Sequence, residues 1–445
     1  MGDVRPFCGL RYNLQQITDL STVVTPPYDV ISPEERSLYY RRSPYNIIRL
    51  ESGEEQPGDS PENNKYTRAA ATLDDWLREE ILVREKQPAF YIVEHRFPYQ
   101  GMEKSRWGLM ARVRLADFES GQIRPHETTT REPAVDRLHL LRSCRTNLSP
   151  IIGLFRTEKG EMAALLQELS KRTPDMSATD SYGVRYCLSV VTDEAAIDKV
   201  STFLTDKVIY IADGHHRYET VLRYQKEQSG AHPRPPGNEP FNFVMMTLTD
   251  SQDPGLVVLP SHRLVRGLES HRIAQLEEMI SPYFHTEELL PSLPTFLDTV
   301  QTWLRTPEME GQGATVLGLY GLHGQKFCLL RLRRNADIRS LMTEEELRLW
   351  GDLDVVLLQR VILQAALGID TREKEDYHLK YTTDGLEART RVDSGEYQLA
   401  FFVNPAPISS VLDTADAGRR LPQKSTYFYP KTPAGLVINP VWDEE

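Results

Sequence analysis

Apolar side chains recur along the chain with two different periods. In the segment 109–115 every second residue is aliphatic. This alternation predicts a strand with one buried face, and the β-forming run at 89–94 predicts its hairpin partner, with a turn at 100–104. Other apolar runs predict further strands at 151–155, 186–191, 208–212, 241–248, 314–320, 327–332 and 398–403.

A helical period separates these strands. Tyr66, Ala70, Leu73 and Leu77 follow one another at spacings of four, three and four, which places them on one face of a helix. Helical patterns are also present at 136–145, 161–169, 194–204, 273–280, 296–304 and 344–367. Strands and helices that alternate in this way predict an α+β, or mixed α/β, fold.

Less regular segments divide the chain. Residues 5–50 predict loops and short elements, 52–64 predicts an exposed loop, and the proline-rich stretch 227–239 predicts an exposed insertion. The length of 445 residues leaves room for roughly two or three domains. We place a soft boundary between an N-terminal part, 1–160, and the remainder, 161–445, although one continuous unit also fits.

Charge and apolar content exclude several classes of protein. The 52 Lys and Arg residues against 64 Asp and Glu residues give a net charge of −12. Nucleic-acid binding draws its affinity from a basic surface, so we expect no nucleic-acid partner. No stretch approaches the roughly 18 consecutive apolar residues of a membrane-spanning helix, and residues 1–10 lack the apolar core of a secretory signal. We therefore expect a cytoplasmic protein without a membrane partner, and the sequence leaves its oligomeric state open.

One strand-to-helix junction carries the densest chemistry. An apolar strand runs directly into Asp213, Gly214, His215, His216 and Arg217, and a helical pattern follows. A strand that ends in glycine and opens a helix presents backbone N–H groups to an anion. In this functional interpretation Arg217 adds a phosphate contact, Asp213 holds a divalent cation or orients a histidine, and either histidine binds phosphate or moves a proton. In the structural alternative, Asp213 caps the helix, Gly214 makes the turn and one histidine is simply packed.

Two further polar clusters are candidates for the same site. His126 and Glu127 lie in a polar loop and are candidates for a general base, while Arg137 downstream is a candidate charge clamp. The alternative is a solvated loop with a local ion pair. His262 and Arg263 follow an apolar run, so we expect them at a strand end, where both binding sites and structural histidines are common.

A C-terminal segment brings additional donors. Lys424, Ser425, Tyr427 and Lys431 would lie over a ligand, with the lysines and hydroxyls as anion donors and tyrosine as a wall. The alternative is an aromatic clamp that pins this segment to the core. Gln423 stands where a Walker A loop requires glycine, so the segment is not a phosphate loop of that type.

The pentapeptide from Asp213 to Arg217 resembles the Asp-Gly-His-x-Arg signature of the ParB/sulfiredoxin-like superfamily. Members of that group include nucleotide-dependent serine kinases and CTP-binding partition proteins. The resemblance implies a nucleotide-binding core elaborated by additional strands and helices. It also implies Mg²⁺ with ATP or ADP as the ligand, with Asp213 holding the metal.

A second resemblance spans nearly the whole chain. Eight segments in order are similar to motifs of the bacterial and archaeal family known as domain of unknown function 1015. They are 24–31, 43–46, 124–127, 136–138, 147–151, 253–256, 259–263 and 422–431. Ser261 stands where that family usually has threonine, and serine keeps the side-chain hydroxyl. This resemblance implies one family-length unit and favours a functional role for His126 and Glu127.

The first functional hypothesis is a phosphotransferase that uses ATP or ADP. By analogy with the resembled serine kinases, its acceptor would be the hydroxyl of a small metabolite such as free serine. Phosphoryl transfer requires positive charge around the moving group, a metal and a base near the acceptor. Arg217, Lys424 and Lys431 would supply the charge, and His126 or Glu127 would be the base.

Two other classes of function remain open at this point. In a metal-dependent hydrolase, His215, His216, His126 and Asp213 would gather a metal that activates water. A non-catalytic switch would bind nucleotide and change partner without turning over a small acceptor.

Overall fold

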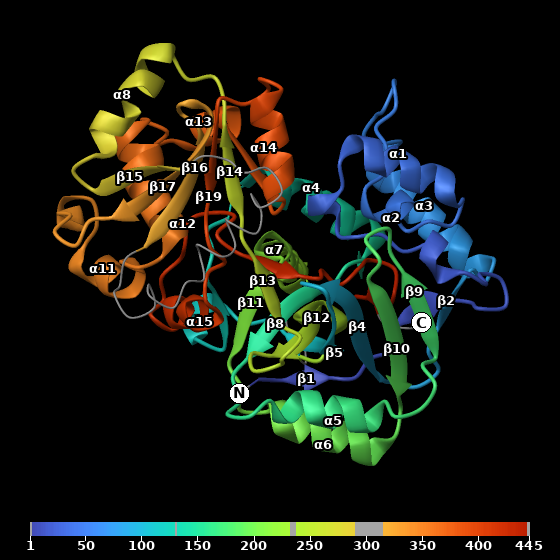
Figure 1. Ribbon diagram of the computed structural model, residues 1–445. Coiled ribbons are helices and arrows are strands. Elements are labelled where there is room, and N and C mark those ends of the chain that lie inside the picture. Colours follow the sequence, from blue (N-terminus) through green and yellow to red (C-terminus); the bar gives the residue numbers. More distant parts are fainter. Residues whose placement is uncertain (1, 130, 232–236, 290–314, 443–445) are drawn as a thin grey trace. The chain divides into compact units, whose positions relative to one another are not determined.

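The computed structural model describes residues 2–129, 131–231, 237–289 and 315–442 (Figure 1). The chain divides into two compact units. The larger unit comprises Met1–Pro125, Thr129–Val257 and Phe428–Glu445, and the smaller comprises His126–Thr128 and Val258–Tyr427. The expected boundary near residue 160 stays a prediction, because compactness alone does not establish which segments fold independently.

A nine-stranded mixed sheet forms the centre of the larger unit. Its strand order is β6-β11-β8-β12-β5-β4-β10-β9, and β1 also pairs with β5. The strands are β1 (Val4–Arg5), β4 (Phe90–Tyr99), β5 (Met102–Arg114), β6 (Ile123–Pro125), β8 (Ile151–Phe155), β9 (Met176–Thr179), β10 (Arg185–Val191), β11 (Ile209–Asp213) and β12 (Phe243–Asp250). Pairing is antiparallel except for β8 with β12 and β6 with β11. Together with its helices, this sheet confirms the mixed α/β fold class.

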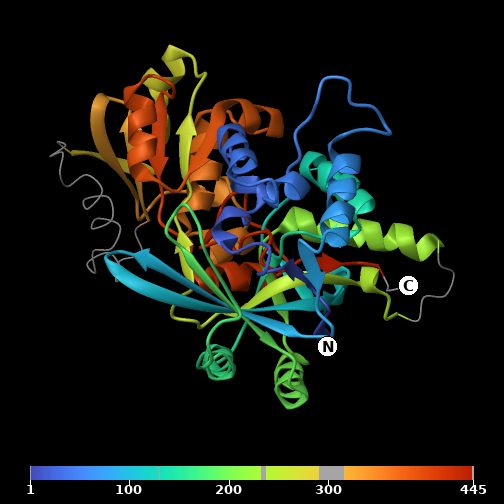
Figure 2. The same ribbon diagram turned by 90° about the vertical axis from the view of Figure 1, so that its right-hand side faces the viewer.

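Helices α5 (Glu161–Leu169) and α6 (Glu194–Leu204) cover one face of this sheet (Figures 1 and 2). Met162 and Val200 from these helices join Ala111 of β5 in one buried apolar cluster. The aliphatic positions predicted in 109–115 therefore face these two helices. The opposite face of the sheet carries the polar residues described below.

The other elements of the larger unit are helices and short strands. They are α1 (Pro33–Arg42), α2 (Ile48–Glu51), α3 (Lys65–Arg78), α4 (Arg131–Cys144) and α7 (His215–Ala231), with β2 (Leu10–Tyr12) paired to β3 (Leu82–Arg84) and β7 (Thr146–Asn147) paired to β21 (Asn439–Pro440). Helix α4 packs against both α3 and α7. This packing places α4 and α7 beside the candidate site.

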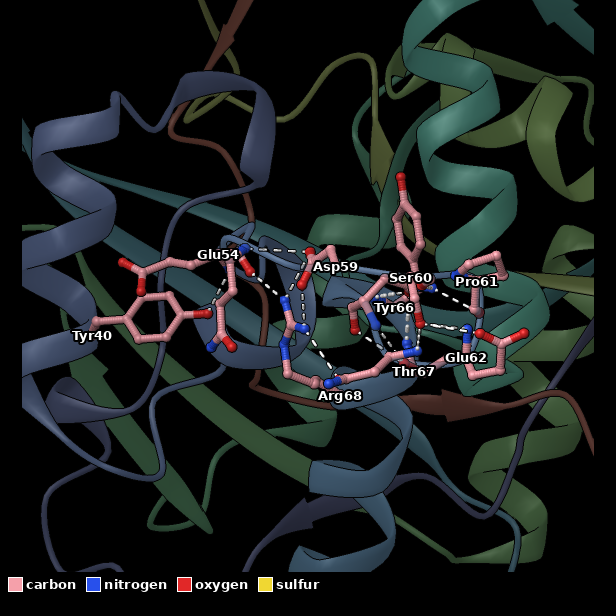
Figure 3. A network of polar contacts seen from close by, with 12 residues as sticks. Tyr40, Glu54, Asp59, Ser60, Pro61, Glu62, Tyr66, Thr67 and Arg68 are labelled. Carbon is pink, nitrogen blue, oxygen red and sulfur yellow. Dashed lines mark hydrogen bonds and ion pairs between the residues drawn. The ribbon is translucent and has the colours of Figure 1, made fainter.

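The helix that sequence periodicity predicted after the polar loop is α3. The side chain of Asn64 accepts hydrogen bonds from first-turn N–H groups, and the Thr67 hydroxyl accepts one from the Asn64 N–H. Arg68, in the first turn of α3, reaches back to the preceding loop and contacts the Asp59 carboxylate and the Glu54 carbonyl there (Figure 3). The first turn of α3 therefore fastens the loop that precedes it.

Helix α1 was not predicted from the apolar pattern. Tyr39 is its only buried residue, so the helix has almost no apolar stripe. Its start is nevertheless encoded locally, because Ser32 and Glu35 form a capping box and Pro33 occupies the first helical position. Capping chemistry, rather than periodicity, was the signal available for this helix.

The smaller unit contains a six-stranded antiparallel sheet with order β15-β17-β16-β19-β14-β18. Its strands are β14 (His262–Val265), β15 (Phe284–Leu289), β16 (Val316–Gly321), β17 (Gly324–Leu332), β18 (Leu379–Thr382) and β19 (Leu399–Phe402). Its helices include α8 (Ser270–Ile280), α11 (Glu344–Trp350), α12 (Asp354–Leu357), α13 (Arg372–His378), α14 (Gly385–Asp393) and α15 (Ile408–Asp416). Two short strands lie at the borders of the units, β13 (Val257–Leu259) and β20 (Tyr427–Tyr429).

The single helix predicted over 344–367 is wrong. Helix α11 ends at Trp350, α12 follows after a break, and a π-helical segment, Leu358–Ala366, comes next. The break between α11 and α12 falls at Gly351 and Asp352, a polar interruption in the apolar pattern, and buried residues are almost continuous only from Leu353 onward. Helical periodicity on both sides of this interruption did not by itself locate the break. The helix predicted at 296–304 lies outside the described residues. So do residues 232–236 of the predicted insertion, whose first residues continue α7.

Candidate functional site

The predicted strand-to-helix junction lies in the larger unit. Strand β11 ends at Asp213 and α7 begins at His215. Between them Gly214 has a φ of 93°, a conformation that glycine adopts without steric cost. A Cβ atom at this position would lie 3.0 Å from Cζ of Arg217. The corner therefore requires glycine both for its backbone conformation and for space.

Arg217 lies in the first turn of α7 and is only 8% exposed. Its guanidinium donates to Oδ2 of Asp213 at 2.5 Å, to the carbonyl of Pro150 and to Oγ of Ser149 at 3.4 Å. Burial lowers the pKa of Arg217, but the carboxylates of Asp213 and Asp29 outweigh burial and raise the pKa above its usual value. In this structure Arg217 therefore holds the Asp213 carboxylate in place, and its direct phosphate contact stays a prediction.

Lys431 joins the C-terminal segment to the same corner. Its Nζ lies 2.6 Å from Oδ1 of Asp213 and 2.8 Å from Oδ2 of Asp29, and its side chain is 8% exposed. The structure thus brings together two predicted site residues, Asp213 and Lys431, that are 218 positions apart in the chain. Asp29, from the proline-rich turn near the N-terminus, completes the group.

The backbone adds positive character at this point. His215, His216 and Arg217 form the first turn of α7, where an α-helix leaves its N–H groups without intrahelical partners and carries the positive end of its dipole. His215 is buried and His216 is half-buried. We call Asp29, Asp213, Lys431 and this first turn the acid–lysine corner.

A cavity of about 50 Å³ lies beside Arg217. Glu51, Arg137, Ser149 and Arg217 are among its polar lining residues, and most of the lining surface is apolar. A space of this size holds a few water molecules. It is a mostly apolar recess beside Arg217 and is too small for a nucleotide.

Arg137 lies on α4 at the edge of this cavity. It donates to the Glu51 carbonyl at 2.6 Å, pairs with the Asp136 carboxylate, and its Cζ lies 4.0 Å from the ring centroid of Tyr28. Burial raises the pKa of the Glu51 carboxyl, although Arg137 and the Ser149 hydroxyl oppose this shift. The predicted clamp is thus fixed by partners of its own, which sequence spacing did not reveal.

A second group of predicted residues lies in the smaller unit. His126 is buried, and its Nε2 lies 3.0 Å from Oγ1 of Thr426. The Glu127 carboxylate accepts the backbone N–H of Lys424, and the Ser425 hydroxyl donates to the Pro422 carbonyl at 2.6 Å. These contacts fasten the loop at 126–128 to the segment at 421–426.

His262 and Arg263 belong to the same unit and are the first residues of β14, so they begin a new strand, which two residues separate from the apolar run of β13. Burial and the adjacent Arg263 lower the pKa of His262 to about 4, so the imidazole is neutral at pH 7. Arg263 donates to the carbonyls of Ser261 and Lys424 and lies over the ring of Tyr381. Tyr427 is half-buried in β20. The phosphate and base roles expected for this second group stay predictions.

Metal ligation can be tested against the described part of the chain. There, no three His, Cys, Asp or Glu side chains come together so that they could hold a metal ion. Within the larger unit, Asp213, His215 and His216, three of the four residues expected to gather a metal in a hydrolase, therefore do not form such a group. Asp213 and Asp29 remain a pair of carboxylates, the type of donor that holds Mg²⁺ together with nucleotide phosphates.

Two participating residues, Ser149 and Glu51, were not identified as site residues from sequence. Ser149 lies within the segment 147–151, which resembles a family motif, so a signal for it was present. Glu51 ends the short helix α2 and carries no local signal. Its role depends on contacts with Arg137 and Ser149, which are distant in the chain.

Comparisons with solved structures found distant likenesses. A conserved hypothetical protein from Pyrococcus furiosus is 12% identical, with a TM-score of 0.35, covering 74% of this chain and 93% of that one. A free serine kinase in complex with AMP is 11% identical, with a TM-score of 0.34, covering 72% and 86%. SbnI from Staphylococcus aureus, with a C-terminal truncation, is 10% identical, with a TM-score of 0.32, covering 73% and 84%. Likenesses this distant carry no functional argument.

Sequence comparison gives a firmer result. No curated protein sequence matched the chain. The model of one protein family matches residues 4–356, which is most of the chain, although the match ends before the C-terminal segment that resembles the last family motif. The chain belongs to the family described as "Protein of unknown function (DUF1015)".

Proposed function

We propose that the larger unit binds ATP or ADP at the acid–lysine corner and transfers a phosphoryl group to the hydroxyl of a small metabolite such as free serine. The observation that carries this proposal is the position of Lys431. Its Nζ contacts both Asp213 and Asp29 beside the first turn of a helix whose N–H groups favour an anion. Local positive charge of this kind suffices for an anion in an acidic protein.

Each residue of the corner has a separate part in the proposed reaction. The first turn of α7 and Lys431 bind phosphate oxygens, and Arg217 acts as a positioning residue for Asp213. Asp213 and Asp29 are the residues that would hold Mg²⁺ when it arrives with a nucleotide, and the ion would neutralise charge on the phosphates. Gly214 allows the backbone to approach the ligand closely.

Fewer observed contacts support the proposed binding of the acceptor than support the proposed binding of the nucleotide. The Asp29 side chain is 23% exposed and its Oδ2 contacts Lys431, and we propose that a small hydroxyl compound approaches the corner from this partly exposed side. Glu127 and His126 remain the predicted bases. Phosphoryl transfer depends mainly on positioning and on electrostatic stabilisation, so loss of a base is expected to slow turnover more than it weakens nucleotide binding.

A turnover assay tests the proposal. Purified protein is incubated with Mg²⁺, ATP or ADP, and L-serine, and phosphorylated product is measured. We expect Lys431→Met to weaken nucleotide binding at least about tenfold, equivalent to ~1.4 kcal/mol. Lys226→Met is the matched control, because Lys226 lies on α7 in an exposed ion pair with Asp117.

The outcomes separate the remaining functional classes. Product that depends on Lys431 supports the transferase. Nucleotide binding without product from serine or other hydroxyl metabolites would favour the non-catalytic switch. Absence of nucleotide binding would rule out both.

A further inference from the structure

Arg106, in β5, is a fully buried arginine whose guanidinium makes no hydrogen bond to the part of the chain that the structure describes. The residue is 0% exposed, and among the described residues none of its three guanidinium nitrogens has a hydrogen-bond partner. Burying a charged group without hydrogen bonds is costly. Native proteins satisfy nearly all buried polar groups, so an exception of this size calls for a functional explanation.

The neighbouring strand presents two more unsatisfied groups. The hydroxyls of Thr247 and Thr249 on β12 are buried and have no hydrogen-bond partner among the described residues. Both lie beside Gly108, which is two residues from Arg106 on the same face of β5. A Cβ at Gly108 would lie 2.6 Å from Cγ2 of Thr247 and 3.5 Å from Oγ1 of Thr249. Glycine keeps this patch free of another side chain.

This patch shares a sheet face with the acid–lysine corner. Ile152 of β8 pairs with Thr247 on one side and with Asp213 on the other, and directly paired residues point to the same face. Across β4, Arg106 pairs with His95, whose Nε2 lies 3.1 Å from Oγ1 of Thr432. Thr432 follows Lys431 in the chain, so the patch and the corner meet the same C-terminal segment.

The charges around Arg106 leave it available for an anion. Burial lowers the pKa of Arg106 to about 10, while Asp253 and Asp213 act in the opposite direction, so the side chain is charged at pH 7. Neither carboxylate hydrogen-bonds to it. Burial and the charge of Arg106 lower the pKa of His95 well below its usual range, so the imidazole remains neutral beside the arginine.

We infer that Arg106, Thr247 and Thr249 form a second oxyanion subsite in the larger unit. It takes a carboxylate or phosphate group of a small ligand. A guanidinium presents donors in a fixed fork that matches such a group, and hydroxyls supply two further donors. This inference deepens the proposed function, on which it rests, because the subsite would bind either the nucleotide phosphates or the carboxylate of an amino-acid acceptor. Because Arg106 is fully buried, the ligand reaches it by a local opening.

The test is thermal unfolding of wild type and Arg106→Met with no addition, with inorganic phosphate, with ADP and Mg²⁺, and with L-serine. Without ligand, we expect the variant to have an equal or higher Tm, because a well-packed apolar side chain replaces an unpaired buried charge. With the ligand that uses the subsite, wild type gains Tm and the variant does not, and its affinity falls at least about tenfold. A response to phosphate and ADP identifies a phosphate ligand, and a response to serine alone identifies a carboxylate.

Two threonine variants provide the matched control. Thr249→Val removes an unsatisfied hydroxyl and should weaken the ligand response without lowering the ligand-free Tm. The Thr414 hydroxyl donates to the Ser410 carbonyl and accepts from Trp350 Nε1. Thr414→Val should therefore lower the Tm and leave the ligand response intact.

Two results would overturn the subsite. One is a lower ligand-free Tm in Arg106→Met, which would show that protein or water satisfies the guanidinium. The other is a ligand response that is absent from wild type or equal in both proteins. If ADP binding depends on Lys431 but not on Arg106, and serine has no Arg106-dependent effect, the proposed function survives and the subsite fails. If phosphate or serine gives an Arg106-dependent response but no nucleotide binds, the subsite survives and the proposed function fails.

Discussion

Gly214 is the residue whose chemistry most directly shapes the candidate site. Its φ is 93°, and a Cβ would lie 3.0 Å from the Arg217 guanidinium carbon. We expect Gly214→Ala to lower the free energy of unfolding by about 1–3 kcal/mol, because it adds backbone strain and displaces Arg217. Urea unfolding measures this difference.

Gly230 provides the control for that substitution. It lies in the same helix, has no positive φ, and a Cβ there would have no atom within 4 Å. Gly230→Ala should leave the protein unchanged or stabilise it by up to about 1 kcal/mol through helix propensity. Equal effects at both positions would contradict the account of the corner.

Asp354, in the smaller unit, predicts a specific pH dependence. Burial raises the pKa of this carboxyl to about 6 from an ordinary value of 3.8, although hydrogen bonds from Asn404 oppose the shift. A raised pKa means that the folded state binds the proton more tightly than the unfolded state. The protonated Asp354 carboxyl therefore stabilises the folded state fully below about pH 4, and this contribution to the free energy of unfolding is lost as the pH rises through about 6.

Asp354→Asn tests this dependence, because an amide does not ionise. Between pH 4 and pH 7, the wild-type free energy of unfolding should fall relative to that of the variant, by at most about 3 kcal/mol. Denaturant titrations at both pH values measure the difference. Identical pH profiles would show that Asp354 does not titrate in this window.

Single-residue chemistry could be predicted where the signal was local. The junction from Asp213 to Arg217 was identified because glycine, acid and base occur together at a strand end. Arg106 lies in a strand where alternation places arginine on the face expected to be polar, so nothing local showed that this face is covered. Its burial depends on β4, β12 and residues near the C-terminus, which are distant in the sequence.

At the scale of elements, capping interactions fix where helices begin. Asn64 caps α3 and also donates to the carbonyls of Ser60 and Pro61. We expect Asn64→Ala to lower the free energy of unfolding by about 1–2 kcal/mol, since it removes the cap and loosens the loop. Asn63→Ala is the control, because Asn63 makes an exposed contact with Arg68; its effect should stay below about 0.5 kcal/mol. A smaller loss in Asn64→Ala than in its neighbour would contradict the capping role.

Periodicity predicted strands better than helix boundaries. The alternation at 109–115 was borne out because β5 has one apolar face against α5 and α6. In the segment 344–367 apolar residues are nearly continuous only from Leu353, so the sequence did not show where α12 ends, and the Gly351-Asp352 interruption at the end of α11 was not used as a boundary. Helix α1 differs from this segment, because its N-terminus has clear capping residues while its surface has almost no stripe of apolar residues. Elements were therefore predictable where polar and apolar residues alternate in the sequence, and boundaries where capping residues are present.

At the scale of the whole molecule, the two compact units divide the predicted site residues. Asp213, Arg217, Arg137 and Lys431 belong to the larger unit, and the residues around His126 and Arg263 belong to the smaller one. Sequence order did not reveal this division, because residues 126–128 are grouped with the later part of the chain and 428–445 with the earlier part. In the described chain, no helix has both the length and the apolar character needed to cross a bilayer.

The most direct test of the central claim is a crystal structure with Mg²⁺ and a non-hydrolysable ATP analogue. The account predicts phosphate oxygens on the first turn of α7, with Lys431 contacting them and Asp213 and Asp29 beside the metal. A nucleotide bound elsewhere, with Lys431 still paired to both carboxylates, would contradict it.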